Sequence, residues 1–356
     1  MTTRLGSVKD LEVLKKPTEN DMGVGKFHFS DRYSVFDWGE MPDQIGGKGA
    51  ALCLMGAYCF EQLERKGVKS HYRGLVDTNG NGKPVKVKEI KTPSNVMEIS
   101  LVNVYKPKTS VAKGKLVHDY SKYTPDLKNC LIPLEIIYRN GLPEGSSVFK
   151  RLEQGKIKPA DLDLDHYPQP GEQLSKPIFD VSTKLEETDR YVTWQEAQKI
   201  AGLTDPELEK IKEVLLKSDE TINEMASRAG LKNEDGKIEL AFDDKRELMV
   251  VDVVGTLDEC RFTYEGVHVS KEIARQFYKK TRWYADLEQA KKEAEAKGIP
   301  DWQSLCASKP PKLDPKLKTI ISEMYMAAAN EMTGHKLFNA PLLAQVIAEY
   351  KEFTKE

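Results

Sequence analysis

Cysteine is scarce in this chain, and the spacings that build disulfide or zinc frameworks are missing. The five cysteines form no C-x-x-C pair, and the six histidines form no H-x-x-x-H pair. An odd number of cysteines without such spacing is typical of reduced thiols, so we expect a cytoplasmic protein without structural disulfides. The scattered histidines give no zinc ligand set and no base for a catalytic triad.

Long apolar runs and an excess of one charge are also missing. No stretch reaches the roughly eighteen apolar residues of a membrane-spanning helix, and Met1-Thr-Thr-Arg-Leu5 contains no apolar signal core. The 54 basic and 56 acidic side chains leave a formal net charge of −2. Without a broad basic field, neither nucleic acid nor a membrane surface is expected as a partner.

Common catalytic signatures are absent as well. There is no G-x-S-x-G elbow and no G-x-G-x-x-G fingerprint.

Gly46-Gly-Lys-Gly49 opens a predicted helix that runs through Lys66, and its free N–H groups suit an anion. It is not a Walker A loop, because Pro42 stands at the place of the first glycine. Residues 77–82 begin like a calcium loop, but a hairpin turn explains them better because Lys88 replaces the bidentate glutamate.

The order of the predicted elements indicates an α+β fold in two lobes. Strand-like runs come first, then mixed elements, then helices, which favours antiparallel sheets over a doubly wound parallel sheet. At 356 residues the chain can bury a substantial core. We expect a β-rich amino-terminal lobe over residues 1–128 and a larger α+β lobe over residues 129–356.

Local patterns predict the individual elements. Residues 131–138 form a predicted buried strand, and the Pro- and Asp-rich residues 155–180 are predicted to run as a long surface connection. Thr193-Trp-Gln-Glu196 and Thr204-Asp-Pro-Glu207 are capping boxes that predict the starts of two helices. Helices are expected over most of residues 270–356.

The most informative segment is Asp235-Gly-Lys-Ile-Glu239, with Asp252 thirteen residues after the glutamate. Residues 237–242 and 247–254 are predicted strands, joined by a loop of four residues. Such a loop places Lys237 opposite Asp252 and Glu239 opposite Val250. Strand alternation then puts Lys237, Glu239 and Asp252 on one face.

This face offers two carboxylates and one ammonium at separations of roughly 5–8 Å. Such a set suits a divalent ion that carries a polyphosphate. The alternative is a solvated hairpin with a cross-strand ion pair, because charged residues normally occupy exposed faces. The pattern by itself leaves both interpretations open.

Several segments match, in order from residue 6 to residue 262, the motifs of one family. Two matches carry most of the weight, namely Leu131-Ile-Pro-Leu-Glu-Ile-Ile-Tyr-Arg139 with Gly145-Ser146, and Asp235-Gly-Lys-Ile-Glu239. The others are Gly6-Ser-Val-Lys-Asp10, Asp31-Arg-Tyr-Ser-Val-Phe-Asp37, Ile45-Gly-Gly-Lys-Gly49, and residues 177–184 and 252–262. Together they resemble the phosphoribosylaminoimidazole-succinocarboxamide synthase, or SAICAR synthetase, family of purine biosynthesis.

The chain departs from the family pattern at several positions. Ser7 replaces the first lysine of the amino-terminal motif, and Leu257 replaces a proline. Glu144 stands where threonine or alanine is expected, and Val253 replaces a glutamate beside Asp252. The hairpin near residues 75–95 and part of the carboxy-terminal helices look like additions. The resemblance is therefore to a divergent member of the family.

The resemblance implies two lobes with antiparallel sheets, a nucleotide cleft like that of ATP-grasp proteins and kinases, and carboxy-terminal helices. It implies an ATP-dependent ligase that joins L-aspartate to the carboxylate of carboxyaminoimidazole ribonucleotide (CAIR), giving SAICAR, ADP and phosphate. Because a carboxylate is a poor electrophile, we expect an acyl phosphate as the intermediate. ATP and Mg²⁺ are the implied cofactors.

The resemblance also implies roles for individual residues. Glu239 and Asp252 would hold Mg²⁺ against the ATP phosphates. Lys237, oriented by Asp235, would neutralise charge on the transferring phosphoryl group or on the reacting carboxylate. The expected cofactor-binding residues are Lys9 and Lys48. The expected substrate-binding residues are Asp37, Arg139, Ser146 or Ser147, Lys184, Asp189 and Arg261.

Two alternatives stay open at this point. The departures at Glu144 and Val253 motivate a ligase of the same fold with a different amine or carboxylate substrate. A non-catalytic nucleotide-binding module is the second alternative, and it is disfavoured because Lys237, Glu239, Asp252 and Arg261 are all present. The implied partners are small molecules, and a homo-oligomer stays open.

Overall fold

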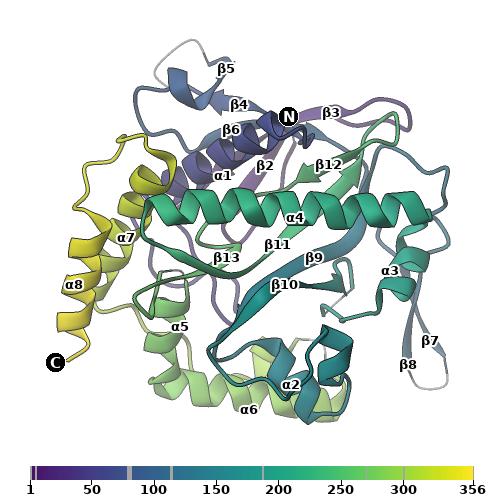
Figure 1. The fold of residues 1–356 in the computed structure, drawn as a ribbon. Helices are drawn as coiled ribbons and strands as arrows, with labels where there is room; N and C mark the ends of the chain where they lie inside the picture. The colour runs from purple at the N-terminus through teal and green to yellow at the C-terminus, as the bar shows by residue number, and fades with distance from the viewer. Residues whose placement is uncertain are drawn as a thin grey trace.

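A computed structural model of the chain describes residues 2–4, 6–77, 82–112, 115–186, 188–269, 271–299 and 301–355. Within them, strands form two larger antiparallel sheets and one separate two-stranded hairpin (Figure 1). No helix of the described residues is long and apolar enough to cross a membrane.

The first sheet is built from the amino-terminal part of the chain, in the order β1-β2-β3-β6-β4-β5. Helix α1, Lys48–Arg65, packs on one face of it. In β3 buried residues alternate with half-buried ones, which is the pattern of a strand with one face on the core. The strands are β1 Thr2–Arg4, β2 Lys9–Lys15, β3 Gly23–Phe29, β4 Tyr72–Val76, β5 Pro84–Val85 and β6 Val96–Leu101.

The second sheet has the order β10-β9-β11-β13-β14. On the edge of β11 that faces away from β9, β13 pairs with the first half of β11 and β12 pairs with its second half. Helix α4, Asp205–Arg228, crosses one face of this sheet (Figure 1). Ile136 and Ile238 lie opposite each other in the ladder and are buried on that face. The strands are β9 Cys130–Leu142, β10 Glu172–Thr183, β11 Lys232–Phe242, β12 Leu248–Val251, β13 Cys260–Tyr264 and β14 Val267–His268.

The remaining elements surround these two sheets. The two-stranded hairpin is β7 Lys108–Ala112 with β8 Lys115–Asp119. The other α-helices are α2 Ser147–Glu153, α3 Trp194–Ala201, α5 Glu272–Lys279, α6 Arg282–Lys297, α7 Pro315–Thr333 and α8 Leu343–Phe353. Single 3₁₀ turns are η1 Val87–Glu89, η2 Pro159–Leu162 and η3 Trp302–Leu305.

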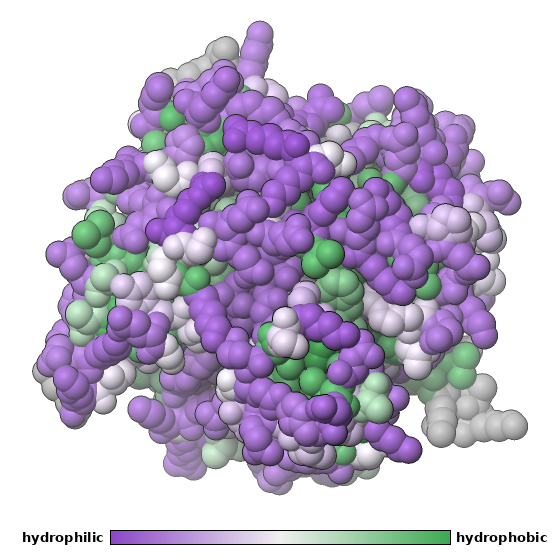
Figure 2. Space-filling view, viewed as in Figure 1, coloured by the Kyte–Doolittle hydropathy of each residue, from purple (hydrophilic) through white to green (hydrophobic). Residues whose placement is uncertain are grey.

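One apolar core connects the two sheets. It includes Met97 and Ile99 from β6, Ile136 from β9 and Ile238 from β11, with Phe60 of α1 among them. The face shown in Figure 2 is largely hydrophilic, and its hydrophobic side chains are scattered in small groups.

The α+β architecture, the antiparallel sheets and most predicted elements are confirmed. Thr193 and Thr204 cap α3 and α4, and the capping box of Thr204 with Glu207 is complete. Residues 78–81 of the turn predicted at residues 77–82 lie outside the described residues. The strands on either side of it, β4 and β5, do pair antiparallel.

The predicted surface connection over residues 155–180 is wrong in its second half. Residues from Glu172 onward form β10, which pairs with β9. Pro177 misled the prediction, because proline cannot donate a ladder hydrogen bond. It is tolerated here because β10 is an edge strand whose register shifts between Gln173 and Ile178.

The predicted register of the 237–254 hairpin is also wrong, by one residue. Glu239 lies opposite Val251 rather than Val250, and β12 ends at Val251, before Asp252. The ladder continues to Asp243 and Glu247, and Arg246 adopts a left-handed backbone with φ 64°. The loop is therefore a three-residue turn with a left-handed third residue instead of a four-residue loop.

Candidate active site

The face of the second sheet opposite α4 carries a row of mostly buried charged side chains. Arg139 lies opposite Asp235, and Glu135 lies opposite Glu239, so all four project to the same side. Lys237 lies between the two acids of β11 on that side. The alternate residues face the core beneath α4, so the sequence of each strand separates a polar face from an apolar one.

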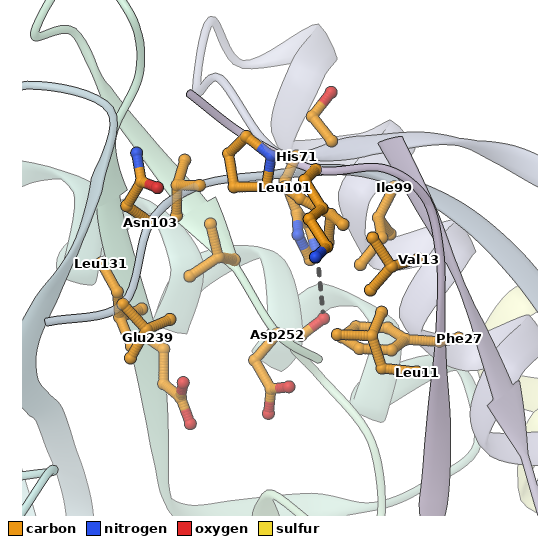
Figure 3. Close-up of a pocket in the computed structure, with 16 residues that line it drawn as sticks. Leu11, Val13, Phe27, His71, Ile99, Leu101, Asn103, Leu131, Glu239 and Asp252 are labelled. Atoms are coloured by element: carbon orange, nitrogen blue, oxygen red, sulfur yellow. Dashed lines mark hydrogen bonds between the residues drawn. The ribbon is translucent and has the colours of Figure 1, made fainter. Parts of the chain in front are cut away.

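Glu239 and Asp252 bring two carboxylates to the same place. Asp252 follows the end of β12 with φ 63°, and this left-handed backbone turns its side chain toward Glu239. Figure 3 shows both carboxylates pointing to the same side, away from the apolar residues above them. The predicted grouping of the two acids is therefore present, although the strand register that predicted it is wrong.

The two carboxylates differ in their affinity for a proton. Burial, and then the negative charge of Asp252, raise the pKa of Glu239 above its ordinary value. Burial also opposes ionisation of Asp252, but the ammonium of Lys9, 2.8 Å from the carboxylate, together with the charges of Lys184 and Lys237, outweighs it and lowers the pKa of Asp252. Two buried acids at one place favour a cation between them.

Lysines alternate with acids along the same face. Lys184 Nζ lies 2.5 Å from Glu239 and 3.5 Å from Glu135. Lys237 Nζ lies 2.6 Å from Glu135 and 3.6 Å from Glu259. Burial lowers the pKa of Lys237, but the charges of Glu259 and Glu135 outweigh burial and raise it, so the ammonium form is strongly favoured.

Asp235 has different partners from those expected. Its carboxylate binds Arg139 at 3.2 Å and Arg261 at 2.5 Å, whereas the ion pairs of Lys237 within the described residues are with Glu135 and Glu259. The expectation that Asp235 orients Lys237 is corrected by this geometry. Glu135 and Glu259 hold Lys237 instead, because they lie within ion-pair distance of its ammonium.

Arg139 is buried and organises the far end of the polar face. Its guanidinium contacts Asp180 at 3.4 Å and the Ser147 hydroxyl at 3.2 Å. Ser146 caps the amino terminus of α2, where its hydroxyl accepts from Val148 N–H. Ser147 lines the adjoining cavity. The geometry thus favours Ser147 over Ser146 as the serine that faces a substrate.

Two cavities meet at this row of charges. The first has a volume of about 460 Å³, and Glu239 and Asp252 lie in its wall. The rest of its lining is largely apolar and comes from both sheets (Figure 3). Its main lining residues are Leu11, Val13, Phe27, His71, Ile99, Leu101, Val102, Val104, Leu131 and Val251.

The second cavity, of about 500 Å³, is lined mostly by charged and polar side chains. Lys237 and Glu135 form the wall nearest the first cavity, and Asp37 lies at the rim. The other charged lining residues are Arg139, Glu144, Asp235, Asp258, Glu259, Arg261, Lys271, Glu272, Arg275, Lys279 and Lys291. Acidic and basic side chains are balanced in this lining, so it suits a polar molecule, and its arginines can bind carboxylate or phosphate groups.

Asp37 lines the second cavity, and Asp189 lies close enough to it to interact with the charges of Glu135 and Asp37. The Asp37 side chain is 87% exposed and pairs with Lys291 at 3.1 Å. Burial, and then the charge of Glu135, raise the pKa of Asp189. Although the residue Asp189 is largely exposed, its carboxyl group thus lies close to the charged row.

Lys9 and Lys48 are placed very differently. Lys9 pairs with Asp252 beside the first cavity, where a phosphate could reach it. Lys48 is completely buried, and its ammonium binds Asp258 at 2.8 Å. Asp31 accepts hydrogen bonds from the N–H groups of Gly47 and Gly49. The helix start thus holds a carboxylate of the chain itself, and Lys48 has no exposed surface for a cofactor.

Four charged residues at the site were not singled out from the sequence. Glu135 lies in the strand predicted as buried, where its position four residues before Arg139 would have placed both on one face. Glu259 pairs with Lys237 from outside the predicted strands. Lys271 and Arg275 line the second cavity from the region of α5, and no sequence pattern signalled them.

The chemistry of this donor set fits Mg²⁺ bound together with a polyphosphate. Among the described residues, no group of three or more His, Cys, Asp or Glu side chains forms a preformed metal site. Glu239 and Asp252 supply two hard oxygen donors. Mg²⁺ typically uses one or two protein carboxylates and takes its other ligands from phosphates and water.

Comparison with known proteins gives a consistent result. The family model for SAICAR synthetase matches residues 18–297. A phosphoribosylaminoimidazole-succinocarboxamide synthase of Thermoplasma acidophilum is 32% identical over 317 residues, which cover 87% of this chain and 93% of the relative. A protein of Archaeoglobus fulgidus named as a “putative phosphoribosylaminoimidazole-succinocarboxamide synthase” is 49% identical over 348 residues. The match covers 98% of this chain and 99% of that relative.

Solved structures agree in fold. A SAICAR synthase from Saccharomyces cerevisiae, complexed with SAICAR, superposes with a TM-score of 0.60 at 20% identity, covering 94% of this chain and 96% of that one. A SAICAR synthetase in complex with ADP gives a TM-score of 0.53 at 19% identity, covering 88% and 100%. The chain therefore belongs to the SAICAR synthetase family.

Proposed function

We propose that Lys237, Glu239 and Asp252 form the centre at which this chain carries out the reaction of its family. SAICAR synthetases join L-aspartate to the carboxylate of CAIR, while ATP becomes ADP and phosphate. The chain is accordingly an ATP-dependent carbon–nitrogen ligase of purine biosynthesis. The observation that carries the placement of the reaction is that an apolar cavity and a charged cavity meet at β11, with Glu239 on one and Lys237 on the other.

The first cavity is proposed to hold ATP. Its apolar lining between Leu11, Val13 and Leu101 suits the flat base, and its wall ends at Glu239 and Asp252. Lys9 lies 2.8 Å from Asp252 and so stands where the phosphates would emerge. A triphosphate in this orientation directs its γ-phosphate toward Lys237 and the second cavity.

Glu239 and Asp252 are proposed to hold Mg²⁺, for which their oxygen donors fit. When bound, the ion would neutralise charge on the β- and γ-phosphates. Lys184, 2.5 Å from Glu239, adds a fixed positive charge at the same place. Burial of these groups strengthens their interaction, because water screens them little.

The second cavity is proposed to hold CAIR and L-aspartate, which together carry a phosphate and several carboxylates. Ser147 and Arg261 lie at one end of it, and Arg139 fixes Asp235 between them. Lys271 and Arg275 add positive charge from α5. Planar guanidinium groups suit the bidentate recognition of both kinds of anion.

The reaction is proposed to proceed through an acyl phosphate of CAIR. An oxygen of the CAIR carboxylate attacks the γ-phosphorus, and ADP leaves. The neutral amine of aspartate then attacks the activated carbonyl carbon, and phosphate leaves with the bonding electrons and takes up the proton that the nitrogen loses. Lys237, held by Glu135 and Glu259, would stabilise the negative charge of the group in transfer.

The test is an assay of ADP release with CAIR, L-aspartate and ATP, in which each substrate is omitted in turn. We expect turnover only with all three, and loss of turnover when other amino acids replace aspartate. Full turnover with a different amine would establish the alternative ligase. ATP binding without carboxylate-dependent turnover would establish the non-catalytic module and contradict the proposal.

Three further expectations are proposals of the same kind. A lobe boundary at residues 128 and 129 is supported by the start of the second sheet at Cys130. A cytoplasmic location is supported by the five free cysteines. A homo-oligomer would be tested by light scattering of the purified chain.

A further inference from the structure

His71 is a buried histidine that the mechanism above does not use. It lies immediately before β4 and is 4% exposed. Its ring contacts Phe27 and Phe60, with centroid distances of 5.9 and 5.4 Å, and one edge lines the first cavity. The dashed line in Figure 3 joins its Nε2 to the main-chain oxygen of Asp252, at 3.1 Å.

The conformation of Asp252 explains why this contact matters. Glu239 lies opposite Val251, so a regular strand would send the next side chain, that of Asp252, to the apolar face shared by Ile238. The left-handed backbone of Asp252, φ 63°, turns the carboxylate back to Glu239. Left-handed residues other than glycine are sparsely populated and persist only where neighbouring groups fix them.

The backbone of His71 is fixed to both sheets. Its N–H donates to Val250 O at 3.0 Å, and Val250 N–H donates to Lys69 O at 2.9 Å. On the other side, Ser100 N–H donates to His71 O at 2.7 Å. His71 thus connects β6 of the first sheet with β12 of the second.

We propose that His71 is a positioning residue that holds Asp252 in its left-handed conformation and so completes the carboxylate pair with Glu239. The carbonyl oxygen of Asp252 can only accept, so Nε2 must carry the hydrogen. His71 touches no reacting atom in this scheme and acts through Asp252. The inference rests on the proposed function.

Two substitutions separate the donor from the shape of the ring. His71→Gln keeps an N–H at about the position of Nε2, whereas His71→Phe keeps the ring and removes the donor. His71→Asn carries a donor that is too short to reach the carbonyl. His28→Gln is the matched control, because His28 lies in the same sheet and pairs with Glu12 at 2.8 Å, away from Asp252.

The experiment is calorimetric titration of the full chain with ADP, in the presence and absence of Mn²⁺. The metal-dependent gain is the ratio of the ADP affinities measured with and without Mn²⁺. We expect this ratio to be about tenfold smaller in His71→Phe than in the wild-type chain, as for other residues that orient metal ligands. Because His71 lines the first cavity, metal-free ADP affinity can also change, but phenylalanine keeps the ring in the cavity wall, so the loss with metal should exceed the loss without it. His71→Gln and His28→Gln should retain most of the metal-dependent gain.

An unchanged gain in His71→Phe would overturn the proposal, and so would an equal loss with and without metal. If His71→Phe does not fold, the comparison of His71→Gln with His71→Asn decides, and equal behaviour of the two would overturn it. A wild-type chain that shows no metal-dependent gain contradicts the proposed function itself, whatever the variants do.

Discussion

The two cavities are nearly equal in volume, about 460 and 500 Å³, but opposite in chemistry. The first is an apolar slot with two acids at one end. The second is lined by acids and bases in close alternation. Both use the same strand, β11, and Lys237 and Glu239 are only two residues apart on it. One face of a single strand can therefore contribute side chains to two binding sites and to the reaction centre between them.

The difference also shows how each cavity obtains its rigidity. The first cavity, the apolar slot, is partly lined by side chains of the hydrophobic core, among them Phe27 and Ile99. The charged cavity is organised by ion pairs such as Arg139 with Asp235 and Lys237 with Glu135. Buried ion pairs contribute little net stability, because desolvation offsets their attraction. Their proposed value here is that they fix positions, which catalysis requires.

The largest expected effect comes from the junction of the two cavities. Glu239→Gln removes one charge of the proposed Mg²⁺ site without changing the size of the side chain. We expect kcat to fall about 10³-fold or more, with the fold retained, because the chemistry depends on positioned charge. Glu239→Ala should abolish ADP release in the same way.

Steady-state ADP release measures this effect, and circular dichroism checks the fold. Glu98→Gln is the control, because Glu98 pairs with Arg73 at 2.9 Å and lines neither cavity. Undiminished turnover in Glu239→Ala would remove the metal assignment.

A change inside the charged cavity should affect its own substrates. Arg139→Lys keeps the charge but loses the fork that contacts Asp235, Asp180 and Ser147. We expect KM for CAIR to rise about 10- to 100-fold, with KM for ATP within about twofold. Arg190→Lys, an exposed residue paired with Glu186, is the control. An unchanged KM for CAIR would argue against this role for Arg139.

A change inside the apolar slot should show the reverse selectivity. Val13→Trp fills part of the first cavity, so KM for ATP should rise about tenfold while KM for CAIR and aspartate stays constant. Leu14→Trp is a matched control, since the next side chain of β2 points to the other face and is 41% exposed. Equal effects of the two substitutions would contradict the assignment of the slot to ATP.

The sequence predicted what depends on local pattern. The alternation of Lys237 with Glu239 placed both on one face, and the structure confirms that face. The sequence also predicted that β11 and β12 pair, but not their register, because the register depends on the left-handed backbone of Arg246. Asp252 reaches Glu239 through a second left-handed residue, and both conformations are held by distant contacts such as that of His71.

The sequence also failed to predict which charged side chains pair with one another. Glu135 and Glu259 hold Lys237 from β9 and from the segment before β13, and neither is near it in the sequence. Lys48 illustrates the opposite error. A lysine at a helix start suggested an anion site, but the pairing with Asp258 that buries it spans more than two hundred residues. Long-range pairing of this kind leaves no local signal.

The smallest kinetic effect is expected behind the sheet, on the α4 side, where neither cavity reaches. Asp219 is 2% exposed, and its carboxylate accepts hydrogen bonds from the side-chain amides of Asn140, Asn223 and Asn233. Burial raises its pKa to about 6, against the opposing effect of these amides. We expect Asp219→Asn to leave both KM values unchanged, because it alters only the support beneath the charged cavity.

Its effect on stability should depend on pH, with a definite sign. The pKa of Asp219 is higher in the folded than in the unfolded chain, so the folded state binds the proton more tightly. The contribution of this proton to the free energy of unfolding of the wild type is therefore lost as pH rises from about 4 to about 6. Asp219→Asn lacks this loss. Its free energy of unfolding relative to wild type should therefore rise by about 1–3 kcal/mol between pH 4 and pH 7. Urea titrations at the two pH values measure the difference, and a flat or falling difference would show that the carboxylate is accommodated in its charged form.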